Sequence, residues 1–85
     1  MKSFNYTIQD EIGIHARPAG LLVKAAKPFT STITLKVNDQ QSDAKKLMAL
    51  MALGVGHGAE ITITAEGDDE DAAITKLEEF FKENL

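Results

Sequence analysis

The chain has 85 residues, a formal net charge of −4 at pH 7 and no cysteine. The acidic balance argues against a nucleic-acid-binding protein, which usually carries a basic face, and the lack of cysteine excludes disulfides, thiol catalysis and thiolate metal sites. No apolar run reaches the length of a membrane span, and the first residues lack the apolar core of a signal peptide. We therefore expect one cytoplasmic domain, residues 1–85, too small to enclose a deep active site.

The first elements are a strand and a helix. Apolar and polar residues alternate over residues 3–8, which predicts a half-buried strand. A helical period follows, and because proline is tolerated only in the first turn of a helix, Pro18 predicts a helix start at Ala16 or Arg17. Pro28 ends this helix. Its apolar face comprises Pro18, Leu22, Ala25, Ala26 and Phe29.

A hairpin and a short helix follow. Residues 32–37 alternate like the first strand, Asn38 and Asp39 predict a tight turn, and the polar residues 40–43 predict an edge strand. Residues 45–53 predict a short helix, with Gly54 as its C-terminal cap.

The last elements are a strand over residues 61–65 and a closing helix. The acidic run 68–71 is expected to cap that helix, since it lacks the spacing of an EF-hand calcium loop. The apolar face of the closing helix comprises Ala73, Ile74, Leu77, Phe80 and Phe81. The order β-α-β-β-α-β-α, with one-sided alternation in the strands, predicts an α+β fold, an open-faced sandwich with helices covering one face of the sheet.

The segment Gly-Ile-His-Ala-Arg-Pro at residues 13–18 is the candidate site. It places His15 and Arg17 at a predicted helix start, where unpaired backbone N–H groups and a partial positive charge attract anions. Histidine is a nucleophile, and arginine offers a fork of donors that suits phosphate. The residues thus predict a histidine that accepts and carries a phosphoryl group; the alternative is an ordinary exposed histidine at a helix cap.

The short helix carries more large apolar residues than one face can bury: Leu47, Met48, Leu50, Met51 and Leu53. We expect Leu50 and Leu53 to lie inside, and the other three to lie at least partly outside as a docking patch, because methionine adapts to several partners.

The second histidine, His57, lies in a glycine-rich loop and is expected to be solvated. Two histidines without a placed carboxylate do not predict a metal site, and the loop lacks the ending of a P-loop. We predict no metal and no organic cofactor.

Three segments carry a resemblance to a known family: residues 13–19, Gly-Ile-His-Ala-Arg-Pro-Ala; residues 51–54, Met-Ala-Leu-Gly; and residues 58–63, Gly-Ala-Glu-Ile-Thr-Ile. Together with the element order they resemble the histidine-containing phosphocarrier (HPr) family of the bacterial phosphoenolpyruvate-dependent sugar phosphotransferase system. The likeness covers essentially the whole chain. It implies four antiparallel strands and three helices.

The resemblance also implies a function. His15 would be phosphorylated on Nδ1 by phospho-enzyme I and would pass the phosphoryl group to a histidine of an enzyme IIA domain. Arg17 would contact the phosphoryl group, and the backbone N–H groups of Ala16 and Arg17 would cradle it. Both partners would dock on a surface made by Leu47, Met48, Met51 and Gly54. A carrier of this kind is not a standalone enzyme, and we expect a monomer with its docking face exposed.

Two positions depart from the family pattern. Many Gram-positive members carry a regulatory serine where this chain has Lys46, so the serine-phosphate branch of regulation is not expected here. Several members have a small polar residue at the position of Ile12, which cannot donate a hydrogen bond to a phosphoryl group.

Two other functions stay open at this point. The chain could serve a regulatory, nitrogen-related branch of the phosphotransferase system, with which Lys46 is compatible. It could also be an interaction module in which His15 is never phosphorylated, although relatives of that kind tend to have lost the histidine.

Overall fold

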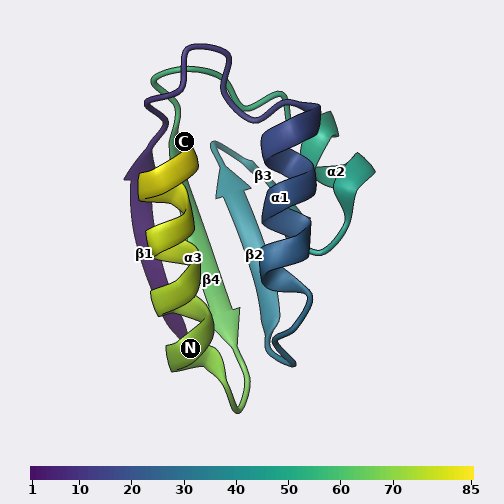
Figure 1. The fold of residues 1–85 in the computed structure, drawn as a ribbon, viewed down its shortest axis with the longest axis vertical. Coiled ribbons are helices and arrows are strands. Elements are labelled where there is room, and N and C mark those ends of the chain that lie inside the picture. Colours follow the sequence, from purple (N-terminus) through teal and green to yellow (C-terminus); the bar gives the residue numbers. More distant parts are fainter.

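The computed structural model describes residues 1–85 as a four-stranded antiparallel sheet and three helices. The strands are β1 (Lys2–Thr7), β2 (Thr32–Val37), β3 (Gln40–Asp43) and β4 (Glu60–Glu66). The helices are α1 (Ala16–Ala26), α2 (Leu47–Ala52) and α3 (Glu70–Asn84). The predicted open-faced sandwich is confirmed, with every element in the expected order (Figure 1).

The sheet order is β1-β4-β2-β3, so the last strand lies in the interior between the first two. Its Ile61 pairs with Tyr6 on one side and with Val37 on the other, and β3 pairs only with β2. Residues alternate between buried and more exposed along β2 and β4, as expected for a sheet with one solvated face. The polar strand β3 forms the predicted edge.

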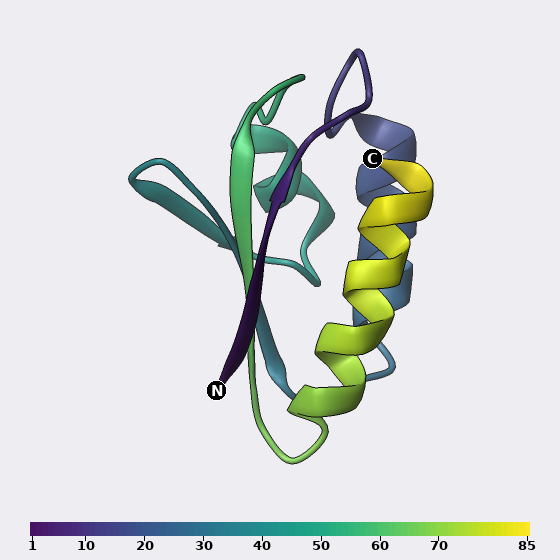
Figure 2. The ribbon, with the colours of Figure 1, turned by 90° about the vertical axis from the view of Figure 1, so that its left-hand side faces the viewer.

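All three helices lie on one side of the sheet, which Figure 2 shows edge-on. Helix α1 packs between α3 and α2, while α3 covers β1 and β4. The core lies between these layers, and Phe81 is its largest fully buried side chain. The Phe81 ring contacts Phe4 and Tyr6 of β1 edge-on, with ring centroids 5.8 and 5.6 Å apart.

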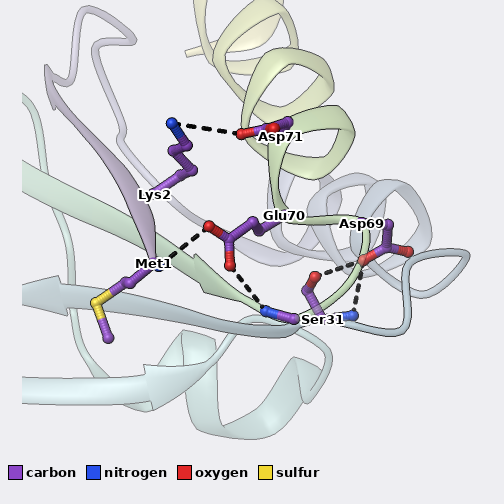
Figure 3. A network of polar contacts seen from close by, with 7 residues as sticks. Met1, Lys2, Ser31, Asp69, Glu70 and Asp71 are labelled. Carbon is purple, nitrogen blue, oxygen red and sulfur yellow. Dashed lines mark hydrogen bonds and ion pairs between the residues drawn. The ribbon is translucent and has the colours of Figure 1, made fainter.

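The acidic run before α3 differs from its expected role. Asp69 is the N-terminal cap residue, but its side chain forms no hydrogen bond to the helix. Its carboxylate instead accepts hydrogen bonds from the Ser31 backbone N–H, at 2.9 Å, and from the Ser31 hydroxyl (Figure 3). It also accepts a hydrogen bond from the Thr30 backbone N–H at 2.8 Å. The Ser31 hydroxyl, followed by the Thr30 N–H, lowers the pKa of Asp69 from 3.8 to about 2. Asp69 therefore joins α3 to the loop before β2.

Glu70, the first residue of α3, contacts groups that lie outside the helix. Its carboxylate accepts a hydrogen bond from the Gly67 N–H at 3.1 Å and lies 3.0 Å from the Met1 amino group (Figure 3). The Gly67 N–H is the main cause that holds the pKa of Glu70 below its usual range. The start of α3 is thus occupied by carboxylates of the chain itself.

The short helix begins later than predicted. It starts at Leu47 because the backbone of Lys46, its cap residue, is extended (φ −119°, ψ 107°). The preceding Lys45 donates from its ammonium group to the carbonyl oxygens of Phe29 and Ser31, at 2.6 and 2.9 Å. Leu53 is the C-terminal cap residue, and Gly54 follows with φ +64°, the left-handed conformation expected for the predicted glycine stop. Leu53 is also only half-buried rather than inside.

Candidate functional site

His15 is the N-terminal cap residue of α1, as predicted from Pro18. Its backbone is extended (φ −115°, ψ −170°), and its carbonyl accepts the first helical hydrogen bond, from Ala19 at 2.8 Å. The side chain forms no capping bond, and the first turn of α1 contains no acidic residue. The imidazole is therefore half-exposed at a helix start that no carboxylate of the first turn neutralises.

The backbone N–H groups of Ala16 and Arg17 point out of the helix start. These residues occupy the first two helical positions, where a helix offers no acceptor, and neither N–H donates a backbone hydrogen bond. Pro18 follows, whose missing N–H would have been the next orphan donor. Two N–H groups beside His15 are thus free to bind an anion.

The loop before His15 is held against the loop after α2. Gly13 has φ +92°, and a Cβ atom there would lie 2.4 Å from the Val55 carbonyl oxygen and 2.6 Å from Gly56 Cα. The next residue, Ile14, donates its N–H to the same Val55 oxygen at 2.9 Å. Only glycine fits this close contact, which sets the position of the backbone that leads into His15.

Asp10 is the residue of the site that sequence reasoning missed. Its Oδ2 accepts hydrogen bonds from the N–H groups of Ile12 and Gly13, each at 3.0 Å, and lies 4.0 Å from His15 Nε2. An aspartate three residues before a glycine is a known turn signal, so the folded-back carboxylate was foreseeable, but its approach to His15 was not.

A shallow groove of about 270 Å³ lies beside His15. Helix α1 and the end of α3 both contribute to its mostly polar lining. The lining residues are Asp10, His15, Arg17, Pro18, Leu21, Glu83 and Asn84. His15 and Arg17, paired by the sequence analysis, therefore share one open surface.

His57 lies on the surface, as expected, but it also contacts the loop before α1. Its Nδ1 lies 3.2 Å from the Asp10 carbonyl oxygen. No group of three or more histidine, aspartate or glutamate side chains is placed to hold a metal ion. No helix is both long and apolar enough to span a membrane.

Helix α2 leaves most of its large side chains in solvent. Met48 is 76% exposed, Leu47 40% and Met51 38%, whereas Leu50 is 1% exposed. This division between core and surface matches the expectation for these four residues. The helix lies beside α1, the helix that begins next to His15, and on the same side of the sheet (Figure 1). Ile12, 69% exposed, adds an apolar side chain in the loop before His15.

Comparison with known proteins identifies the family and agrees with the fold. A family model described as "PTS HPr component phosphorylation site" matches residues 2–83. The chain belongs to the HPr family. The histidine-containing phosphocarrier protein of Mycoplasma is 40% identical, with a TM-score of 0.94, and the match covers 96% of this chain and 93% of that one.

Two further relatives extend the comparison. An HPr structure from Thermoanaerobacter tengcongensis is 39% identical (TM-score 0.92; 96% of this chain, 92% of that one). Crh of Bacillus subtilis, described as a catabolite repression protein with a swapped, intertwined dimer, is 38% identical (TM-score 0.78; 94% and 92% covered). The family is one of phosphocarriers of the phosphotransferase system, and the fold of this chain is that of HPr.

Proposed function

We propose that this chain accepts a phosphoryl group from phospho-enzyme I on His15 and passes it to an enzyme IIA domain during sugar uptake. The observation that carries the proposal is the open start of α1, where His15 lies next to two free backbone N–H groups and no acidic residue occupies the first turn. The membership of the HPr family supports the same role. The protein is then a cytoplasmic relay and not a standalone enzyme.

The residues account for reversible transfer. The lone pair of His15 Nδ1 attacks phosphorus, the bond to the donor histidine breaks, and its electron pair returns to the donor nitrogen. Donors from the Ala16 and Arg17 backbone and from the Arg17 guanidinium balance the phosphoryl charge. A surface anion at a helix N-terminus gains only about 0.3–1 kcal/mol, so the group is held without being trapped.

The docking surface for both partners comprises Leu47, Met48, Met51 and Gly54. Its exposed methionines can adapt to two differently shaped partners, and the encounters are expected to be transient. We expect a monomer in this role, since swapping of the kind described for Crh would change what lies around the site.

The deciding experiment mixes the protein with phosphoenolpyruvate, magnesium and its host's enzyme I. We expect an acid-labile, base-stable phosphate that is lost in His15→Ala. His57→Ala is the matched control, because it removes the other histidine of the chain and should still accept phosphate. Absence of transfer to the wild-type protein would refute the relay and leave the interaction module.

Lys46 supports a carrier without serine regulation. It is exposed at the start of α2, where many relatives have their regulatory serine, and the nearby Ser42 is buried. Incubation with a serine kinase of the HPr type should therefore leave the chain unmodified by mass spectrometry. Phosphoserine at Ser42 would contradict this.

The regulatory, nitrogen-related branch is an alternative with which Lys46 is also compatible, and transfer assays with enzyme IIA domains of each branch separate the two.

A further inference from the structure

We propose that Asp10 is a positioning residue that keeps the ring proton of His15 on Nε2, so that the Nδ1 lone pair is available to phosphorus. The proposal rests on the function proposed above. Its basis is the 4.0 Å separation between Asp10 Oδ2 and His15 Nε2, in a loop whose shape fixes the carboxylate.

Asp10 is anchored in four ways. Its carboxylate accepts from the N–H groups of Ile12 and Gly13, its own N–H donates to the Leu85 oxygen at 2.8 Å, and its carbonyl oxygen lies 3.2 Å from His57 Nδ1. A carboxylate that accepts from two adjacent backbone N–H groups is already ordered, so it loses little freedom when it faces a neighbour. The charge is thus set beside His15 before any partner arrives.

The position of this charge distinguishes the two ring nitrogens. In neutral imidazole one nitrogen carries the proton and the other a lone pair, and the neighbouring groups decide which. A carboxylate near Nε2 attracts an N–H there and repels a lone pair there. Nδ1 is then the nucleophile.

The same charge stabilises the phosphorylated ring. When Nδ1 forms its bond to phosphorus, the bond to the donor breaks with its electron pair on the donor nitrogen, and the His15 ring becomes formally cationic with the proton still on Nε2. The Asp10 carboxylate faces that positive edge. On onward transfer the electron pair returns to Nδ1, so no proton has to leave His15 in either direction.

Other charged groups surround the ring but do not take this position. Arg17 and Glu83 line the same groove, and His57 contacts the carbonyl and not the carboxylate of Asp10. Asp10 is the residue whose carboxylate lies within ion-pair distance of His15, at 4.0 Å. A carboxylate at this edge also disfavours phosphorylation on Nε2, because it would repel the incoming phosphoryl oxygens.

The test compares Asp10→Asn with the wild-type protein. The amide oxygen can still accept from Ile12 and Gly13, so the turn is preserved while the charge is removed. Nitrogen-15 NMR of the free protein reports which ring nitrogen of neutral His15 carries the proton. In Asp10→Asn we expect a larger fraction of neutral His15 to carry its proton on Nδ1. We also expect kcat for transfer from phospho-enzyme I to fall about five-fold, with little change in KM. This is the effect of removing one unit charge at about 4 Å in bulk water.

The control is Asp68→Asn, an exposed aspartate at the start of α3 whose replacement changes net charge equally. It should leave both the tautomer and kcat unchanged. An unaltered tautomer in Asp10→Asn would overturn the proposal, even if transfer were slower, because Asp10 would then act only on loop structure. Since the NMR measurement needs no enzyme I, it remains decisive if the wild-type protein accepts no phosphate, a result that would refute the proposed function alone.

Discussion

Helices α1 and α3 begin in opposite ways. The first turn of α1 has no acidic residue, and its cap residue is a half-exposed histidine without a capping bond. The first turn of α3 contains Glu70 and Asp71, and its cap residue is Asp69, which is tied to the loop before β2. Both starts have the same partial positive charge, since it arises from the backbone.

The difference teaches how one backbone feature serves two purposes. At α3 the chain's own carboxylates lie at this positive helix end, and the result is a fixed connection between the helix and the sheet. At α1 the first turn contains no carboxylate. The carboxylate of Asp10, in the loop before α1, lies 4.0 Å from Nε2 of the His15 ring. A helix start like that of α1 can bind an anion that belongs to another molecule.

The largest effect is expected from Gly13→Ala, which disturbs the loop that sets the open start. Its Cβ would overlap the Val55 oxygen in a left-handed backbone, so we expect a loss of roughly 2–4 kcal/mol in the free energy of unfolding. Gly20→Ala, within α1, meets no atom within 4 Å and should instead stabilise by roughly 0.5–1 kcal/mol. Urea denaturation measures both, and equal effects of the two changes would show that the Gly13 contact is not tight.

A smaller effect is expected from Ala16→Glu, which makes the start of α1 resemble that of α3. The new carboxylate competes with the phosphoryl group, so transfer should slow roughly five-fold, while a negative charge in the first turn leaves Tm unchanged or slightly raised. Ala16→Gln is the uncharged control. Stopped-flow transfer and thermal unfolding give the two readouts, and an equal slowing by glutamine would point to bulk instead of charge.

The smallest effect is expected from Asp69→Asn, which weakens the hydrogen bonds that join the start of α3 to the loop before β2. The pKa of Asp69 is lowered to about 2, chiefly by the Ser31 hydroxyl, so the ionised group stabilises the fold above its unfolded pKa of 3.8. We expect a lower Tm at pH 7, and a difference from wild type that narrows as the pH falls from about 5 to about 2. Thermal unfolding across this range tests it; a constant difference would mean that the charge of Asp69 contributes nothing. Phosphoryl transfer should not change.

The sequence was sufficient for features that depend on local patterns. Pro18 located the start of α1, and alternation located β1, β2 and β4. The excess of apolar residues in α2 predicted that some of them would be exposed, as Met48 is, while Leu50 is buried. Two of the features that sequence reasoning missed join residues far apart. Asp69 bonds to Ser31, and Lys45 bonds to the carbonyl of Phe29. These partners lie 38 and 16 positions apart in the sequence, and no periodicity reveals them. The approach of Asp10 to His15 was also missed, although the two residues are close in sequence, because it depends on the conformation of the loop between them.

The bonds from the Gln9 and Asp10 N–H groups to the Leu85 oxygen have a mechanical consequence. They join the loop that leads into His15 to the residue that follows α3, and α3 packs against β1 and β4. A motion of α3 relative to the sheet is therefore transmitted to the backbone before His15, so the stiffness of this loop depends on how firmly α3 is packed.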